Sequence, residues 1–172
     1  MLITTAKNLL ETIIKGRIKG VTVVRLASEE THAIMARQYP LVSLITNPGS
    51  FDDSEARTVR YYDTGVKSFQ QRYVRGARVL PILLRCWAAG EEETDEVFSK
   101  IIPAIPSQWN YDNFTGAVEI GTEEHSDHTG NVAELYLSVA EIRFKVPVAL
   151  EDELSPTIKI IEPQGGEFAR QE

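Results

Sequence analysis

The chain has 172 residues and a formal net charge of −7, and 42% of its residues are hydrophobic and 25% charged. This length fits one domain with a core of its own, and this composition excludes a largely disordered chain. The single cysteine, Cys86, excludes an intrachain disulfide and fits a reducing compartment of synthesis. Lys7 and Glu11 interrupt the first apolar run, so we expect no signal peptide, and no run approaches the roughly 18 apolar residues of a membrane span.

The first third of the sequence alternates helical and β-strand patterns. Thr4 or Thr5 is the expected N-cap of the first helix, whereas Ser28 is the expected N-cap of the second and Pro40 its end. Apolar spacing and β-branched runs define the elements between these signals. In chain order, we predict a helix over 4–16, a strand over 21–26, a helix over 28–38, a strand over 41–46 and a polar loop over 47–55.

The middle of the chain predicts a hairpin followed by a buried strand. Residues 58–62 and 69–74 form the two arms of the hairpin around Thr64 and Gly65. The next strand, 79–87, is apolar on both faces, which is typical of a central strand. Pro81 lies within it and has no N–H to donate, which instead indicates a sheet edge or a bulge. The two signals conflict.

The second half of the chain predicts a helix and a pair of strands. Acidic residues favour the helix start, and Pro103 is expected to kink or end the helix. The apolar face of the last strand changes near Ala140, which predicts a β-bulge there. In chain order, we predict a helix over 94–105, a connector over 108–115, a strand over 118–120, a polar excursion over 123–131 and a long strand over 132–148.

These elements predict an α+β fold. We expect a mostly antiparallel sheet with helices packed on one face and with extended β-hairpin or loop arms. Residues 1–150 form a single domain in this interpretation, with a loop and hairpin insertion over 47–75. Residues 151–172 form a polar C-terminal extension.

Charge is segregated along the chain. Residues 56–85 carry seven basic residues against one acid, Asp63, so this segment has a charge of +6 and the remainder −13. The seven are Arg57, Arg60, Lys67, Arg72, Arg75, Arg78 and Arg85. An acidic protein with one basic segment is a poor nucleic-acid binder, but it can pair this segment with an acidic face of a neighbour. A solvated face balanced by nearby acids is the alternative.

The polar excursion holds the densest group of potential metal ligands. They are Glu123, Glu124, His125, Asp127 and His128. Imidazole and carboxylate groups at this spacing can bind a divalent metal, but a solvated hairpin tip explains them better because no rigid second shell is apparent. We therefore predict no metal and no cofactor, and we place His125, Asp127 and His128 with Arg57, Arg60, Arg72, Arg75 and Arg78 as candidate interface residues.

No catalytic motif is recognisable in the chain. Cys86 lies among apolar residues and fits a core thiol better than a nucleophile, and His32 has no recognisable partner pattern. The aromatic residues Trp109, Tyr111 and Phe114 lie in the predicted connector, where they either cover the core or anchor an interface. We therefore expect no catalytic residue and no enzymatic activity.

The order of the elements resembles that of the tail terminator (tail completion) proteins of long-tailed bacteriophages. The resemblance covers residues 1–150 and has no diagnostic motif. It rests on the N-terminal helix LLETII, on the strand and helix RVLPILLRCWAAGEEETDEVFSKIIPAI, and on the closing strand NVAELYLSVAEIRFKVPVAL. The 47–75 insertion and the C-terminal extension have no counterpart in the pattern.

The resemblance implies a structural virion protein of the tail or neck, assembled in the host cytoplasm. Six copies would form a ring that ends tube growth at the head-proximal end and joins the tail to the head connector. The implied partners are other copies, the tail tube, the head–tail connector and, as a further candidate, a sheath protein. DNA would pass through the pore without specific binding, and no membrane is involved.

Alternatives from the same and from other classes stay open. Another head–tail joining or neck protein and a tail-tube protein are the nearest. A small metal-dependent enzyme built around His125, Asp127 and His128 is one alternative of a different class. A monomeric binding module that uses the basic face from Arg57 to Arg85 is another.

Overall fold

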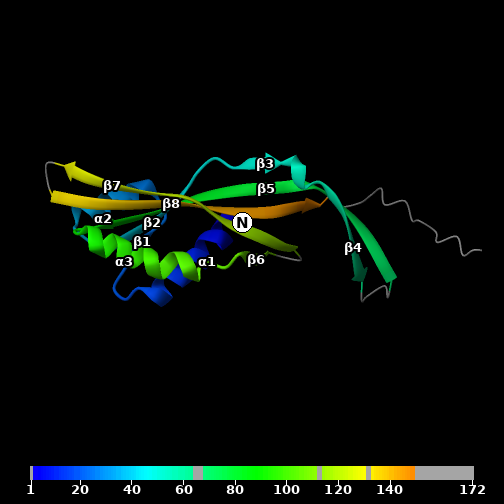
Figure 1. Ribbon diagram of the computed structural model, residues 1–172, viewed down its shortest axis with the longest axis horizontal. Helices are drawn as coiled ribbons and strands as arrows, with labels where there is room; N and C mark the ends of the chain where they lie inside the picture. Colours follow the sequence, from blue (N-terminus) through cyan, green and yellow to red (C-terminus); the bar gives the residue numbers. More distant parts are fainter. Residues whose placement is uncertain (1, 64–67, 112–113, 131–132, 150–172) are drawn as a thin grey trace, which may run out of the picture.

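The computed structural model describes residues 2–63, 68–111, 114–130 and 133–149 (Figure 1). Within these ranges, the side chains of residues 55, 59–63, 68–72, 111, 114, 127–130, 133–134 and 149 lie outside the description. The elements in chain order are α1 (Leu2–Arg17), β1 (Thr22–Val24), α2 (Ala27–Met35), β2 (Leu41–Thr46), β3 (Ser50–Asp52), the 3-10 turn η1 (Asp53–Glu55), β4 (Arg57–Asp63), β5 (Ser68–Ala88), α3 (Glu91–Ile101), the 3-10 turn η2 (Ile102–Ala104), β6 (Gln108–Tyr111), β7 (Phe114–Gly130) and β8 (Ala133–Ala149).

All eight described strands belong to one mixed sheet. Its strand order is β1-β2-β5-β8-β7-β6, and β3 and β4 also pair with β5. Only the β1–β2 pair is parallel among the described strands. The predicted α+β fold with a mostly antiparallel sheet is thus confirmed.

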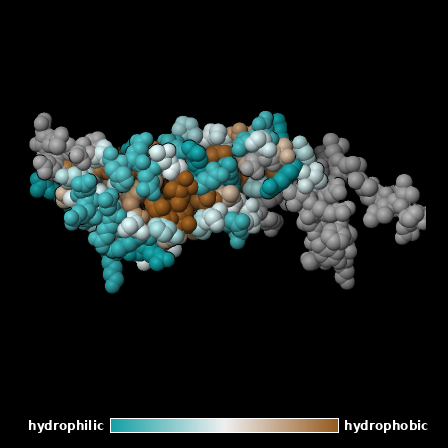
Figure 2. All heavy atoms as spheres, in the orientation of Figure 1, coloured by the Kyte–Doolittle hydropathy of each residue, from teal (hydrophilic) through white to brown (hydrophobic). Residues whose placement is uncertain are grey.

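Helices α1 and α3 cover one face of this sheet and bury the main core (Figure 1). The helices contribute Leu10, Ile14, Phe98 and Ile101, each at most 3% exposed. The sheet contributes alternate residues, because successive side chains of a strand point to opposite faces. On β5 and β8 these are Leu80, Ile82, Leu84, Cys86, Ala140, Ile142, Phe144 and Val146. In the view of Figure 2, apolar side chains gather near the middle of the molecule among hydrophilic ones.

Helix α2 lies on the opposite face of the sheet. It packs against β2 at Ser43, whose neighbours Val42 and Leu44 belong to the main core on the α1 side. The expectation of helices on one face therefore holds for α1 and α3 but not for α2. The α2 packing adds a second, smaller buried layer.

Strand β5 is the central strand of the sheet, and it explains the conflicting signals at Pro81. β2 pairs with β5 up to Ile82, and β3 begins to pair with it at Val79. Pro81 lies in the gap between the two, where its carbonyl accepts a hydrogen bond of 3.0 Å from the Asn47 N–H. Because N and C=O of one strand residue point the same way, the Pro81 nitrogen faces this gap and not β8, so the missing N–H leaves the β5–β8 ladder complete.

The β-bulge predicted near Ala140 lies at this position of the β7–β8 ladder, but on β7 and not on β8. The pairing of β8 with β5 runs without a shift through Ala140, and Ser138, Ala140 and Ile142 are all buried on one face. The register shift lies in β7, between Ile120 and Glu123, opposite this part of β8. Leu137 and Val139 of β8 are half-buried on the other face, beside Trp87 and Arg85 of β5. The apolar positions of β8 therefore change face near Ala140 because β8 is covered on both faces of the sheet.

Several predicted boundaries also differ from the structure. Helix α1 begins at Leu2, so neither Thr4 nor Thr5 caps it, and α2 begins at Ala27, before Ser28. The carboxylate of Glu29 accepts hydrogen bonds from the N–H groups of Arg25 and Leu26 at the start of α2. Helix α3 also begins earlier than predicted, and its α-helical part ends before Pro103, as predicted.

Three segments predicted as loops contain strands. The polar loop over 47–55 contains β3 and η1, and the connector over 108–115 contains β6 and the start of β7. The polar excursion over 123–131 is strand as far as Gly130, where it pairs with β8. None of the helices in the described part of the chain is long and apolar enough to cross a membrane.

Candidate functional site

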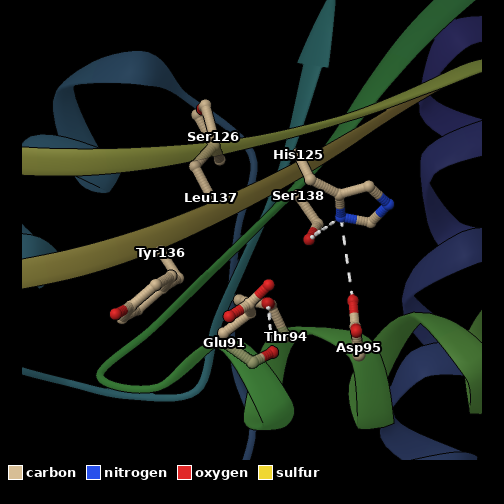
Figure 3. Close-up of a pocket in the computed structure, with 8 residues that line it drawn as sticks. All are labelled: Glu91, Thr94, Asp95, His125, Ser126, Tyr136, Leu137 and Ser138. Carbon is tan, nitrogen blue, oxygen red and sulfur yellow. Dashed lines mark hydrogen bonds and ion pairs between the residues drawn. The ribbon is translucent and has the colours of Figure 1, made fainter.

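A pocket of about 210 Å³ lies between the start of α3 and the β7–β8 hairpin (Figure 3). The start of α3 is acidic, which the positive end of the helix dipole favours. Strands β7 and β8 supply the other wall, because their register places His125 opposite Ser138. The lining residues are Glu91, Thr94, Asp95, His125, Ser126, Tyr136, Leu137 and Ser138.

His125 is the central side chain of this pocket. Its Nδ1 lies 2.7 Å from Oγ of Ser138 and 3.8 Å from Oδ1 of Asp95. Its ring lies edge-on to Phe98 of α3, with the ring centroids 6.3 Å apart. The imidazole therefore joins the polar hairpin to the helix that covers the sheet.

The three side chains Ser138, His125 and Asp95 do not form a nucleophilic triad. A relay needs the serine and the carboxylate on different ring nitrogens, whereas both face Nδ1 here, and the other nitrogen points away from them (Figure 3). Ser138 is also only 1% exposed within a sheet strand. In this geometry the buried Ser138 hydroxyl has a hydrogen-bond partner and the His125 ring is held in place. The hydroxyl is not activated as a nucleophile.

No group of three or more metal-binding side chains gathers among the residues that the structure describes. The backbone of β7 pairs Asp127 with Tyr136 and His128 with Leu135. The side chains of Asp127 and His128 lie outside the described residues. The metal site predicted as an alternative thus has one described ligand, His125.

The basic segment is divided in the structure. Arg57, Arg75 and Arg78 are exposed on β4 and β5, and the guanidinium of Arg75 lies 5.9 Å from the ring centre of Phe51. Arg60 and Arg72 belong to the paired backbone of β4 and β5, but their side chains lie outside the described residues. The predicted basic face therefore follows one hairpin.

The β4–β5 hairpin with its arginines lies at the opposite end of the molecule from His125, whereas Arg78 lies at the middle of β5, opposite Phe51 of β3. Figure 1 shows β4 and the first part of β5 at one end and the tips of β7 and β8 at the other. The candidate interface residues therefore form two separate groups instead of one site.

Arg85 is separate from this basic hairpin and belongs to a buried network around Glu30 of α2. The Glu30 carboxylate accepts hydrogen bonds from Ser43 at 2.6 Å, Trp87 Nε1 at 2.7 Å and Arg85 Nη1 at 3.2 Å. Glu30 is 5% exposed. An acid in the first turn of a helix suits the helix dipole whether it is exposed or buried, so the sequence alone does not reveal this network.

An open groove of about 550 Å³ lies on the sheet face opposite α1 and α3. β3 and η1 form one side, with Asp52 and Asp53, and β8 forms the floor. Lys145 in the floor forms an ion pair of 2.9 Å with Glu119 and lies 4.0 Å from Asp52. A hydrogen bond from the Ser54 hydroxyl is the main cause that lowers the pKa of Asp52. The groove is mixed in charge, and its cations are paired within the chain.

The remaining candidates from the sequence have structural roles. Cys86 is fully buried, and desolvation raises the pKa of its thiol to about 12. Trp109 is 4% exposed and packs edge-on against Phe144 at 5.0 Å between ring centres, so it covers the core. His32 is exposed on α2.

No protein-family model matches the chain, and a search of curated proteins finds no match.

Proposed function

We propose that the protein is a structural subunit of a long-tailed bacteriophage virion. Six copies form a ring at the head-proximal end of the tail tube, end tube growth and join the tail to the head connector. The proposal rests on the resemblance in element order. The architecture supports it with an N-terminal helix, a mostly antiparallel sheet and helices packed on that sheet.

The observation that carries an assembly role is the β4–β5 hairpin, which extends beyond the helix-covered body (Figure 1). β4 pairs along its whole length with β5 and with no other described strand. A two-stranded ribbon is only marginally stable in water when it stands alone. A hairpin of this kind gains stability when it contacts another subunit, which favours a protein that acts in an assembly.

The two ends of the molecule also differ in charge. Exposed Arg57 and Arg75 lie on or beside the hairpin at one end, whereas exposed Glu123 and Glu124 lie on β7 towards the other. Unlike ends favour head-to-tail contacts between identical subunits, and such contacts close into rings when the rotation between neighbours allows it. This asymmetry supports a ring over a two-fold dimer.

The described pockets support a structural role more than a catalytic one. The His125 pocket has no activated nucleophile, and the larger groove has carboxylates and cations that pair with one another. A small metal-dependent enzyme would need further ligands beside His125, and a monomeric binding module would need no self-association. Both remain outcomes of the test below.

The test is the solution mass of the full chain at several concentrations, with negative-stain images taken with and without tail tubes. We expect closed six-fold rings that cap the tubes and stop their elongation. Open-ended tubes built from the protein itself would instead identify a tube protein. A strict monomer that ignores tail tubes would overturn the proposal, and zinc titration by calorimetry would then examine the enzyme alternative.

A further inference from the structure

One long edge of the sheet lacks a strand partner in the described part of the chain. β6 pairs with β7 only from Phe114 to Ala117, and the Val118 N–H then donates to the Ser107 carbonyl at 2.9 Å. Beyond this point β7 pairs with β8 alone among the described strands. The outward N–H and C=O groups of residues 119–130 therefore form an open edge, which we call the acidic edge.

A second open edge lies on the β4–β5 hairpin. Residues 57–63 pair with residues 68–74, and no further described strand lies beside β4. We call residues 57–63 and 68–75 the basic arm. Open edges of this length invite pairing with another chain, so their composition decides which pairings form.

The two edges have opposite charge. The acidic edge contains Glu119, Glu123, Glu124 and Asp127 and has no lysine or arginine. The basic arm contains Arg57, Arg60, Arg72 and Arg75, with Asp63 and Lys67 near its turn. Each edge would repel a second copy of itself, because like charges on facing strands destabilise a pair. The two edges would attract each other, because opposite charges on facing strands stabilise a pair.

We propose that the basic arm of one subunit pairs with the acidic edge of β7 in the next subunit and so continues the sheet across the interface. This inference rests on the proposed ring and identifies the contact that closes it. Main-chain hydrogen bonds between the strands supply affinity, as in other cases of strand addition. The charges supply direction, so that an arm meets an edge and not another arm.

The arrangement within one chain excludes pairing of the basic arm with the acidic edge of the same subunit. The basic arm and the tip of β7 lie at opposite ends of the molecule (Figure 1). Residues 76–88 of β5 lie between the arm and the far end of the sheet, a length of about 40 Å. A chain therefore cannot bring its own arm to the tip of its own β7. Each copy offers one arm and one edge, which defines a head-to-tail contact.

The test is a charge-swap experiment on the full chain. The arm variant carries Arg57→Glu and Arg60→Glu, the edge variant carries Glu123→Arg and Glu124→Arg, and the combined variant carries all four substitutions. We expect the arm and edge variants to lose the ring when each is alone. The combined variant should form the ring again. An equimolar mixture of the arm variant and the edge variant should also form it, with the two kinds of subunit alternating around the ring.

A matched control variant reverses two exposed charges elsewhere, with Arg17→Glu and Lys19→Glu near the end of α1. It should keep the wild-type ring, because neither residue lies on the arm or the edge. Circular dichroism of every variant checks the fold. Amide hydrogen exchange of the wild type provides a measurement without substitution: residues 119–126 should exchange more slowly in the ring than in the diluted protein.

The outcomes separate this inference from the proposed function. Wild-type rings that persist in the arm and edge variants, with unchanged exchange on β7, would overturn the arm-to-edge contact and leave the ring intact. A wild type that forms no ring under any condition would overturn the proposed function together with the contact. Rings restored in the mixture but absent from each variant alone would support both.

Discussion

The Glu30 carboxylate accepts a hydrogen bond of 2.7 Å from Nε1 of Trp87, and this contact joins α2 to the central strand β5. The two residues are 57 positions apart in sequence. The same carboxylate also receives the Ser43 hydroxyl and the Arg85 guanidinium, so a buried charge has three donors. The network places α2 on the sheet face opposite α1 and α3.

Removing the Glu30 carboxylate should destabilise the fold. Glu30→Ala leaves the indole N–H and the Ser43 hydroxyl without their acceptor and the partly exposed Arg85 without its counter-ion, so we expect a loss of about 2–3 kcal/mol. Urea denaturation, monitored by tryptophan fluorescence, measures this loss of unfolding free energy. Glu92→Ala, on an exposed turn of α3, is the matched control and should change the free energy of unfolding by less than about 0.5 kcal/mol. Equal stability of the two variants would contradict this role of Glu30.

Replacing Arg37 with glycine should stabilise the protein. Arg37 follows the end of α2 with a φ of 52°, a left-handed conformation that side chains disfavour and glycine adopts freely. Its N–H donates to the Ile34 carbonyl at 3.0 Å, an arrangement that Arg37→Gly preserves. We expect a gain of up to about 1 kcal/mol in thermal or urea unfolding. Arg37→Ala is the control, and a gain of the same size in that variant would show that backbone strain is not the cause.

Two glycine-to-alanine substitutions should have opposite effects. A Cβ at Gly116 would collide with the Lys145 carbonyl oxygen and lie 2.5 Å from Nε1 of Trp109, so Gly116→Ala should cost at least about 2 kcal/mol. A Cβ at Gly16, in the last turn of α1, would meet no atom within 4 Å. Gly16→Ala should therefore stabilise the helix by about 0.5–1 kcal/mol. Chemical denaturation of both variants measures these changes in the free energy of unfolding. Two changes of the same sign would contradict the packing at Gly116.

The Cys86 thiol should be unreactive in the folded protein. With a pKa of about 12, it is a thiolate in only about one molecule in ten thousand at pH 8, and burial also blocks reagents. Labelling with a chromogenic disulfide should proceed only in denaturant. The pKa is raised from its ordinary 9.0, so stability from the neutral thiol is complete below pH 9 and is lost as the pH rises towards 12. Rapid stoichiometric labelling at pH 8 in buffer would refute this.

Reversing the charges of Arg72 and Arg75 together should weaken assembly while leaving the fold intact. Both belong to the β5 strand of the basic arm, and the exposed Arg75 contributes little to folding. We expect Arg72→Glu with Arg75→Glu to lower the oligomer mass measured by light scattering, with an unchanged circular dichroism spectrum. An oligomer mass equal to that of the wild type would exclude this part of the arm as an interface.

Local patterns in the sequence were sufficient to predict the two longer helices and the buried strands of the core, but not the full length of β7. The helix at Leu10 and Ile14 and the strand at Leu84 and Cys86 follow from apolar spacing, because a helix or strand must turn one face towards a core. The hairpin around residues 64–67 is confirmed in its two arms, because its strands pair locally. The covering role of Trp109 was also among the sequence predictions and is confirmed by its burial against Phe144.

The short edge strands β3 and β6 could not be predicted in the same way. Each has only three or four residues, and each is a strand because β5 or β7 supplies hydrogen-bond partners. The polar tip of β7 is strand for the same reason, since β8 pairs with it as far as Ala133. The sequence prediction placed the bulge on β8 instead of β7. The apolar pattern of one strand cannot show which of two paired strands carries the extra residue.

The sequence by itself determined the α+β class, the core residues of the long elements and the separation of basic from acidic segments, because periodicity and charge are properties of the local chain. Only the tertiary structure decided the burial of Glu30, the gap that accommodates Pro81, and the opposite ends at which the basic arm and His125 lie. Each of these depends on strands brought together from distant parts of the sequence, and no local pattern specifies the partner.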